Sequence, residues 1–329
     1  MIEVRNLVKK YGNHTAVNNL SFTVEKGQVY GFLGPNGAGK STTMNMIIGY
    51  LSATDGEVVI NGHDIFEEPE EAKKCIGYLP EIPPLYPDMT VKEYMQFVAD
   101  LKKLPKKNHQ ELIKQAMDMT KITDVSHRLI KYLSKGYKQR VGFAQAILGF
   151  PEIIILDEPT VGLDPKQIIE VRDLIKKLSA NHTIILSSHI MQDISAVCDH
   201  ILIINKGELV AEGTPDDLAE MTQASQEVKL RLRGMKSEVE NVLSQVANVH
   251  RKEFSVSDEE GTVDVLVFAK KETDIREDLF QAFAKANIPI LSMNAYVKSL
   301  EDIFLEVTDE KKTKKKFNAL KKTKQESEE

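Results

Sequence analysis

The chain has 329 residues, of which 42% are hydrophobic and 28% are charged, and its formal net charge is −6. This ordinary globular composition excludes a disordered chain, a fibrous repeat and a disulfide-stapled miniprotein. At about 150 residues per domain the length predicts two domains. The acidic balance lacks the basic field that draws proteins onto nucleic acid, so we expect no nucleic-acid partner.

The first two thirds of the chain, to about Leu218, alternate short β-branched runs with amphipathic helical stretches. This pattern predicts an α/β domain with a mostly parallel sheet flanked by helices. Runs that are apolar without alternation suit strands covered on both faces, and they occupy residues 29–33, 58–60, 153–156, 183–186 and 201–204. From about 83 to 150 helical periodicity replaces such runs, over 91–101 and 110–119. We interpret this stretch as a helical insertion.

Residues 219–226 are polar without a strong period, and we place a domain boundary near residue 222. The first domain then spans 1–222, and an accessory domain spans 223–308. The accessory domain reads as strand, helix, two strands, helix and strand, over 227–233, 237–246, 253–256, 263–269, 275–286 and 290–296. This order resembles a βαββαβ sandwich, a small α+β fold. An amphipathic helix over 299–307 completes it.

The end of the chain, residues 309–329, is a lysine-rich tail that finishes in Glu-Ser-Glu-Glu. Such a charge run predicts a solvated, disordered end. The alternative is that the tail contacts anionic lipid headgroups or an acidic partner surface.

Cysteine usage and hydropathy indicate the compartment. Cys75 and Cys198 are far apart and lack the spacing of a zinc or redox motif. We therefore expect two buried thiols in a reducing compartment such as the cytosol. No apolar stretch approaches the roughly 18 to 20 residues that span a bilayer, and no secretory h-region follows Met1. If a membrane is involved, we expect another chain to span it.

A phosphate-loop motif lies where the first apolar run gives way to a helix. It matches G-x-x-x-x-G-K-[ST] and consists of Gly34, Pro35, Asn36, Gly37, Ala38, Gly39, Lys40, Ser41 and Thr42. The glycines let backbone N–H groups converge on phosphates, Lys40 brings positive charge to the β- and γ-phosphates, and the Ser41 hydroxyl can reach Mg²⁺. The strand-to-helix context favours phosphate binding over a mere glycine-rich turn.

A pair of carboxylates follows the apolar run 153–156. Ligands bind at the carboxyl edge of open α/β sheets, so Asp157 is a candidate ligand of the metal. Glu158 is a candidate general base that polarises a water for attack on the γ-phosphate. The alternative is that the two carboxylates only cap the turn before Pro159.

Further residues fit the same site. His189 follows the run 183–186 and therefore lies at the same sheet edge, where it can sense the γ-phosphate and orient Glu158 and the water. A structural histidine is the alternative. Tyr11 and Val17 precede the phosphate loop, where an aromatic face and an apolar wall can sandwich adenine.

With these residues in place, the chain resembles the nucleotide-binding subunit of an ABC transporter over residues 2 to about 218. The segment LSKGYKQR (133–140) is similar to the family signature Leu-Ser-Gly-Gly-Gln, GLDP (162–165) matches its D-loop, and GYLPE (77–81) stands at its Q-loop. The resemblance implies a P-loop NTPase fold with a helical subdomain. Lys135 and Tyr137 depart from the signature, and Glu81 replaces the usual Q-loop glutamine.

The resemblance also implies a mechanism with ATP and Mg²⁺ as cofactors. Two ATPs would lie between two head-to-tail subunits, as a homodimer or a heterodimer with a paralogue. Ser134 caps a helix whose amino end faces a phosphate, so Ser134 and Gly136 would contact the partner's γ-phosphate, and Asp164 would align the two halves. Mg²⁺ would be held by Ser41, Asp157 and Glu81, with Glu81 as an added anionic ligand.

The accessory domain ends in SLEDIFLEVT (299–308), which resembles the ATPases of ABC-2-type exporters, a group with drug-export, sodium-export and gliding-motility members. The resemblance implies an ATPase that drives a separate integral-membrane permease, contacted by the helical insertion, from the cytoplasmic face of the cell membrane. Two alternatives remain open. One is a soluble, non-transport ABC ATPase, and the other is a nucleotide-gated regulatory module.

Overall fold

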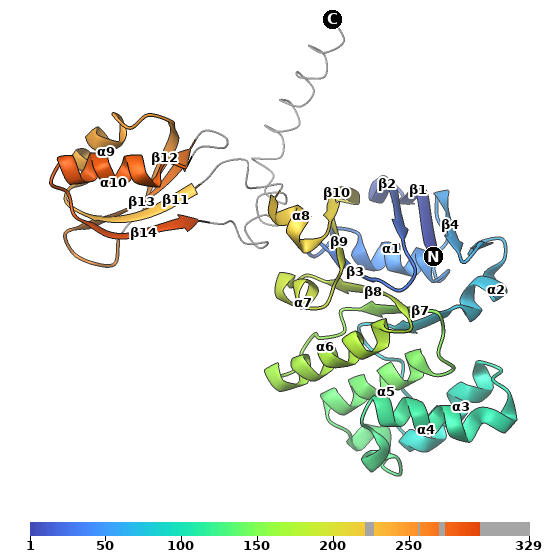
Figure 1. Cartoon of the computed structure of the whole chain (residues 1–329). Coiled ribbons are helices and arrows are strands. Elements are labelled where there is room, and N and C mark those ends of the chain that lie inside the picture. The colour runs from blue at the N-terminus through green and yellow to red at the C-terminus, as the bar shows by residue number, and fades with distance from the viewer. Residues whose placement is uncertain (221–226, 256, 270–273, 297–329) are drawn as a thin grey trace, which may run out of the picture. The chain divides into compact units, whose positions relative to one another are not determined.

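The computed structural model describes residues 1–220, 227–255, 257–269 and 274–296 (Figure 1). The chain divides into two compact units, with the division between Pro215 and Asp216. The boundary predicted near 222, the helix predicted over 299–307 and the tail 309–329 lie outside the described residues.

The first unit begins with an antiparallel sheet. Its strand order is β2-β1-β4-β5, with the bounds β1 (Ile2–Tyr11), β2 (His14–Val24), β4 (Asp55–Ile60) and β5 (His63–Asp64). The prediction that the run 58–60 belongs to the parallel sheet was wrong, because Ile60 and its neighbours in β4 pair antiparallel with β1. β4 is buried on one face only, so its short apolar end was mistaken for a strand covered on both faces.

The second sheet of this unit carries the predicted parallel strands. Its order is β10-β9-β3-β8-β7-β6, and only β10 runs antiparallel to its neighbour. The bounds are β3 (Val29–Leu33), β6 (Ile76–Leu79), β7 (Ile153–Asp157), β8 (Thr183–Ser188), β9 (His200–Asn205) and β10 (Glu208–Gly213). Every residue of β3, β7 and β8 is buried, which explains their continuous apolar runs.

Helices surround these sheets. The α-helices of the first 220 residues are α1 (Lys40–Ile47), α2 (Pro69–Lys74), α3 (Val91–Leu101), α4 (His109–Met119), α5 (Lys135–Ile147), α6 (Pro165–Ser179), α7 (Met191–Ser195) and α8 (Pro215–Glu220). Short 3-10 turns occupy Lys106–Asn108, Thr123–Val125 and Ile130–Tyr132. The helical insertion is confirmed, since α3, α4 and α5 come between β6 and β7 in the chain and lie together in Figure 1.

One hydrophobic core holds the antiparallel sheet, α1 and the parallel sheet together. It contains fully buried residues from each layer, such as Ile2 of β1, Met44 of α1 and Ile155 of β7. Burial of these apolar side chains stabilises the packing of the two sheets and thereby positions the ends of the parallel strands. The strand ends are the platform on which the predicted site is built.

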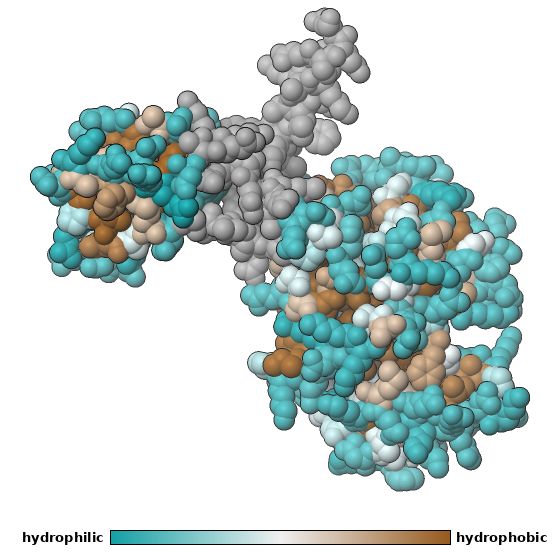
Figure 2. All heavy atoms as spheres, viewed as in Figure 1, coloured by the Kyte–Doolittle hydropathy of each residue, from teal (hydrophilic) through white to brown (hydrophobic). Residues whose placement is uncertain are grey.

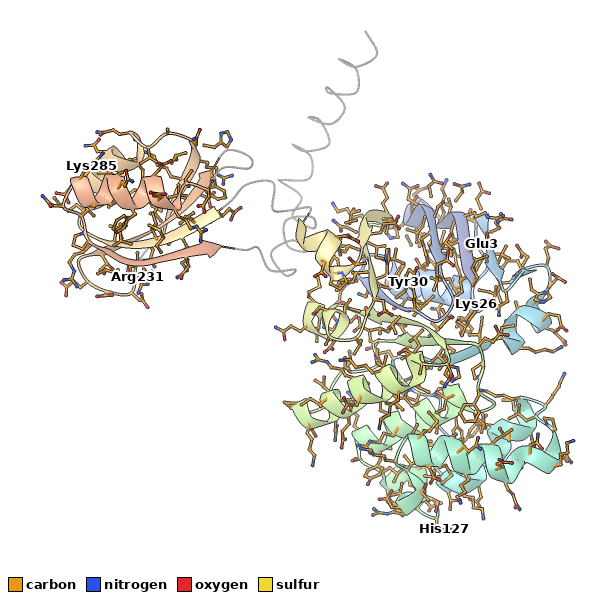
Figure 3. The ribbon with its side chains drawn as sticks, viewed as in Figure 1. Glu3, Lys26, Tyr30, His127, Arg231 and Lys285 are labelled. Carbon is orange, nitrogen blue, oxygen red and sulfur yellow. The ribbon has the colours of Figure 1, made fainter. Side chains whose placement is uncertain are left out.

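The second unit has the predicted strand and helix order. Its antiparallel sheet, in the order β12-β13-β11-β14, is covered by two helices, with the bounds β11 (Glu227–Arg233), α9 (Lys236–Leu243), β12 (Val249–Ser255), β13 (Thr262–Ala269), α10 (Arg276–Lys285) and β14 (Ile290–Tyr296). Leu230, Val265 and Phe283 are fully buried between the layers. Figure 3 labels Lys285 on the helix layer and Arg231 on the sheet layer, where Arg231 bonds Asp264 over 2.7 Å.

The surface of both units is mostly hydrophilic in the view of Figure 2, with scattered apolar patches. Among the described residues, no helix has the length and hydropathy needed to cross a membrane.

Candidate functional site

Four neighbouring strand ends bring the predicted site residues together. β3, β8, β7 and β6 run parallel and lie side by side in that order. The phosphate loop follows β3, His189 comes directly after β8, Glu158 comes directly after β7, and Glu81 comes shortly after β6. Because parallel strands end at one edge, these four segments line a single site.

The phosphate loop depends on glycine at Gly37 and Gly39. Their φ angles are +80° and +104°, which L side chains rarely adopt. A Cβ on Gly39 would also lie 2.6 Å from the carbonyl oxygen of Ala16. Gly39 is the N-cap of α1, so the loop turns sharply and leaves the first N–H groups of α1 free to bind an anion.

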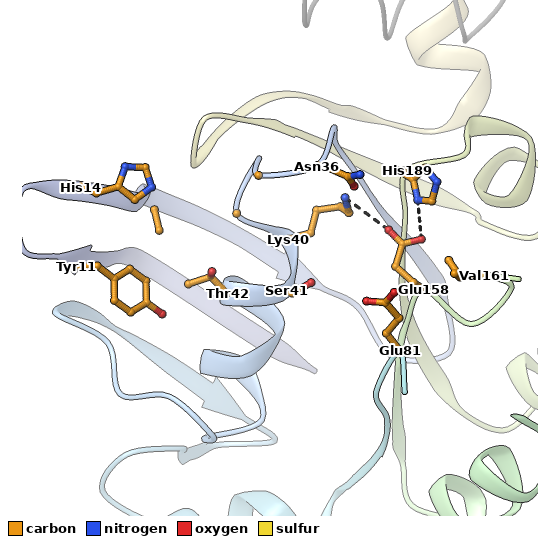
Figure 4. A pocket seen from close by; sticks show the side chains of 13 residues that line it. Tyr11, His14, Asn36, Lys40, Ser41, Thr42, Glu81, Glu158, Val161 and His189 are labelled. Carbon is orange, nitrogen blue, oxygen red and sulfur yellow. Dashed lines mark hydrogen bonds and ion pairs between the residues drawn. The ribbon is translucent and has the colours of Figure 1, made fainter. Parts of the chain in front are cut away.

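Lys40 is held inside the loop, with only 6% of its side chain exposed. Its Nζ donates to the carbonyl oxygens of Gly34 over 2.8 Å and Pro35 over 3.4 Å. It also lies 3.5 Å from Oε1 of Glu158 (Figure 4). A buried lysine needs such partners, and they aim its charge into the space that a phosphate would occupy.

Glu158 is fixed by backbone and side chain. Its φ is +48°, and its N–H donates to Oγ of Ser187 over 3.0 Å. Ser187 in turn donates to Oδ1 of Asp157 over 2.5 Å. On the open side, Nδ1 of His189 lies 3.0 Å from Oε2 of Glu158 (Figure 4). Glu158 therefore has a left-handed backbone conformation, which is strained for a residue other than glycine. Such strained residues are often found at functional sites.

Asp157 offers a carboxylate next to the hydroxyl of Ser41. Burial raises the pKa of Asp157, while the hydrogen bonds from Ser187 and Ser41 oppose that rise. Hydroxyl and carboxylate oxygens suit a hard cation such as Mg²⁺. No group of three or more His, Cys, Asp or Glu side chains in the described part of the chain is suited to hold a metal.

The loops enclose a cavity of about 550 Å³. It is lined by Tyr11, His14, Ala16, Asn36, Gly37, Gly39, Lys40, Ser41, Thr42, Glu81, Glu158, Val161 and His189 (Figure 4). Tyr11 is half exposed at one end, and the acidic residues Glu81 and Glu158 lie at the other. The cavity therefore runs from an aromatic ring, across the phosphate loop, to the carboxylates.

Some predicted residues lie elsewhere. Val17 does not line the cavity, because its side chain is fully buried in the core and Ala16 faces the cavity instead. Gly34 and Pro35 act through the carbonyl oxygens that hold Lys40. The Ala38 carbonyl accepts a hydrogen bond from the N–H of Gly207 over 2.8 Å.

Sequence reasoning missed three cavity residues, His14, Ala16 and Val161. His14 pairs with Tyr11 across the β1–β2 turn, so a predicted hairpin around Gly12 and Asn13 could have revealed it. Val161 follows the carboxylate pair closely in sequence, but nothing in its residue type indicates a ligand.

The signature residues lie outside this cavity. Ser134 is the N-cap of α5 and accepts from the N–H of Tyr137 over 3.4 Å. Gly136 packs so tightly that a Cβ would lie 2.6 Å from Nε2 of the Gln167 side chain. Asp164 caps α6 and accepts from the N–H of Gln167 over 2.9 Å. Within one chain, Ser134, Gly136 and Asp164 thus form a second cluster apart from the cavity.

Comparison with known proteins agrees with this geometry. A family model described as ABC transporter matches residues 17–161. The chain is 33% identical over 312 residues to the linearmycin resistance ATP-binding protein LnrL of Bacillus subtilis, covering 94% of this chain and 98% of that protein. It is 33% identical over 309 residues to the bacitracin transport ATP-binding protein BcrA of Bacillus licheniformis, covering 93% and 97%.

Solved structures give the same result. An ATP-binding subunit of an ABC transporter matches with a TM-score of 0.63 and 30% identity, covering 68% of this chain and 93% of that one. A dimeric ATP-binding cassette in a post-hydrolysis state, bound to ADP and Pi, matches with a TM-score of 0.59 and 25% identity, covering 65% and 98%. The chain therefore belongs to the family of ABC transporter ATP-binding proteins.

Proposed function

We propose that the cavity binds ATP with Mg²⁺, that Glu158 and His189 catalyse its hydrolysis, and that this hydrolysis drives a separate membrane permease. The observation that carries the proposal is the arrangement of Glu158 between two groups. Lys40 lies 3.5 Å from one carboxylate oxygen and His189 lies 3.0 Å from the other. A carboxylate held between a phosphate-binding lysine and a histidine is suited to accept a proton beside a γ-phosphate.

Binding would use the cavity along its length. The half-exposed ring of Tyr11 offers a face on which adenine can stack. The phosphates would then lie over the phosphate loop, where the N–H groups of α1 and the charge of Lys40 attract them. Because Lys40 already points at the carbonyl oxygens of the loop, little side-chain freedom is lost when the nucleotide binds.

Ser41, Asp157 and Glu81 are the residues that would hold Mg²⁺, which would neutralise part of the negative charge of the bound phosphates. Glu81 lines the same cavity as Ser41, and the bond from Ser187 keeps the Asp157 carboxylate turned in a fixed direction. An oxygen-only ligand set of this kind favours Mg²⁺ over softer metals.

Hydrolysis then needs one proton acceptor. The oxygen of a water attacks the γ-phosphorus, the bond to the bridging oxygen breaks, and that oxygen leaves with the electron pair on ADP. Glu158 takes the proton of the water as the new bond forms. His189 keeps the carboxylate turned toward the water and can bond the γ-phosphate with its other ring nitrogen.

We further propose that two subunits complete each site. Ser134 and Gly136 begin α5, whose amino end attracts phosphate, and both lie outside the cavity of their own chain. In a head-to-tail dimer these residues would contact the partner's γ-phosphate, and Asp164 would lie at the interface. The partner is a second copy or a paralogue. The dimeric cassette with ADP and Pi supports this arrangement.

We propose that the direction of transport is export and that the ATPase acts from the cytoplasmic face of the cell membrane. LnrL is a linearmycin resistance ATP-binding protein and BcrA is a bacitracin transport ATP-binding protein, and both align over more than nine tenths of this chain. Such a subunit works with an integral-membrane permease, which carries the pathway.

The test is to purify the tagged chain from membranes, identify any polytopic protein that accompanies it, and measure ATP hydrolysis with and without that protein in lipid vesicles. A permease that stimulates turnover supports the transport role. Full activity with a soluble partner, or with no membrane protein at all, would instead favour a non-transport ATPase.

A further inference from the structure

Two loops leave the sheet side by side and carry the proposed catalytic pair. One follows β7 and contains Glu158, and the other follows β8 and contains His189. A second contact joins the loop after β7 to α7 (Met191–Ser195), which follows the His189 loop: Oγ1 of Thr160 donates to Oδ2 of Asp193 over 2.5 Å. Thr160 comes two residues after Glu158, and Asp193 comes four residues after His189. The Glu158 loop is therefore tied at two points to the segment that follows β8.

Asp193 also binds the helix that follows the D-loop (162–165). The other oxygen of its carboxylate, Oδ1, accepts from a terminal nitrogen of Arg172 over 2.5 Å. Arg172 lies in α6, which starts immediately after Asp164. One carboxylate thus holds Thr160, on the amino side of the D-loop, and Arg172, on its carboxyl side.

This cluster is buried and specific. Thr160 is 6% exposed and Asp193 is 4% exposed. Buried polar groups are stabilised by their partners and penalised without them. Arg172 is 27% exposed, its Nε is buried without a hydrogen-bond partner among the described residues, and a terminal nitrogen of its guanidinium binds Asp193. Such a contact fixes geometry more strongly than an exposed ion pair does.

We propose that Asp193 and Thr160 are positioning residues for hydrolysis. Their bond holds the His189 loop against the Glu158 loop, so that the histidine stays within reach of the carboxylate. Because the Asp193 carboxylate also binds Arg172, the distance between His189 and Glu158 depends on the position of the D-loop. Neither side chain lines the nucleotide cavity, so neither touches the substrate. The inference rests on the proposed ATPase activity.

The experiment compares ATP hydrolysis by the full chain with that of Thr160→Val, Thr160→Ser and Asp193→Asn. The valine removes the donor at nearly constant volume, and the serine keeps it. Loss of one hydrogen bond to a charged group corresponds to about tenfold in rate. We expect Thr160→Val and Asp193→Asn to lower kcat about tenfold with KM for ATP changed less than about twofold, and Thr160→Ser to restore most of kcat.

Thr120→Val is the matched control. Thr120 is a buried threonine in the helical insertion whose hydroxyl donates to the carbonyl of Ala116 over 2.8 Å. Thr120→Val removes the same chemical group from a residue that bonds its own helix and does not line the cavity, so kcat should keep its wild-type value after correction for the folded fraction. If Thr160→Val does not fold, Asp193→Asn carries the same comparison.

A double-mutant cycle separates positioning from a structural role. If the Thr160–Asp193 bond acts through His189, then Thr160→Val should lower the single-turnover rate of the His189→Ala variant by less than about twofold. Rate losses that multiply independently would overturn the inference, as would a kcat for Thr160→Val equal to that of Thr120→Val. If the wild-type chain does not hydrolyse ATP, the proposed function itself fails, which is a different outcome.

Discussion

Lys40 and Glu158 face each other across the floor of the cavity. Nζ of Lys40 lies 3.5 Å from Oε1 of Glu158, and their side chains are only 6% and 8% exposed. Before a phosphate arrives, the buried charge of each side chain is compensated by the other. A γ-phosphate would draw Lys40 to itself and leave the carboxylate free to accept a proton. In the proposed mechanism, the pair would therefore link ATP binding to the activation of Glu158 as the base.

Lys40→Met is expected to weaken ATP binding by about a hundredfold, because a charge-assisted bond to phosphate is lost. The variant also leaves the carboxylate of Glu158 buried without its cation. Titration with a fluorescent ATP analogue measures the affinity. Lys26→Met is the control, since Lys26 is two-thirds exposed and lies outside the cavity. Equal affinity for the two variants would contradict the role of Lys40.

His189→Ala is expected to lower kcat by about a hundredfold while KM for ATP stays near its wild-type value, since positioned acid–base groups contribute at least that much. A bond from the imidazole to the γ-phosphate would be one of many contacts to the triphosphate, so most of the ATP affinity should remain with the phosphate loop and Lys40. Steady-state kinetics give both constants. His127→Ala, at an exposed position of the helical insertion, should behave as wild type. A variant that changes only KM would disprove the assignment.

Gly39→Ala and Gly37→Ala separate two effects in the phosphate loop. Both replace a glycine with positive φ, which destabilises by about 1 to 2 kcal/mol. Only the alanine at Gly39 also meets a backbone oxygen, that of Ala16, whereas a Cβ on Gly37 has nothing within 4 Å. We therefore expect Gly39→Ala to lower the free energy of unfolding more than Gly37→Ala does. Urea unfolding measures both, and equal losses would refute the predicted clash.

Lys102 gives a pH-dependent prediction. Its Nζ donates to three carbonyl oxygens at the end of α5, those of Gln145, Ala146 and Leu148, and burial lowers its pKa to about 8. Between that pKa and the ordinary value of 10.5, the unfolded chain binds a proton that the folded chain lacks. Stability relative to a Lys102→Met variant should therefore rise with pH in this window.

The measurement for Lys102 is the free energy of unfolding of wild type and Lys102→Met from about pH 7 to about pH 10, the range that contains the lowered pKa. Lys107→Met, at an exposed position, removes a lysine without removing these bonds and should show no such trend. A difference between wild type and Lys102→Met that stays flat, or shrinks as pH rises, would contradict the prediction.

Much of the fold could be predicted because its strands are either buried on both faces or bounded by clear turns. The helix predicted over 91–101 agrees with α3, whose Thr90 and Glu93 form a capping box. The antiparallel strands β1 and β2 were missed. Residues of positive φ, Asn6 and Asn19, accompany irregular register in this pair, so alternation breaks along both strands.

The candidate site also contains residues that the sequence could predict and residues that it could not. Lys40 and Glu158 belong to motifs whose spacing reflects the chemistry of phosphate, and the sequence therefore reveals them. The bond between Thr160 and Asp193 joins residues 33 positions apart. No local pattern marks such a pair, because only the packing of two loops on adjacent strands brings them together. The prediction that Val17 lines the adenine site was wrong for a related reason. A shift of one residue along a strand places the side chain on the opposite face, and Ala16 lines the cavity instead.

The most direct test of the account is ATP hydrolysis and ATP binding by Glu158→Gln, which keeps the shape of the side chain but removes the proton acceptor. The account predicts normal ATP affinity, turnover at least about a hundredfold below wild type, and a stable dimer that accumulates with ATP and not with ADP. Turnover equal to wild type in Glu158→Gln would show that another group is the base and would overturn the central claim.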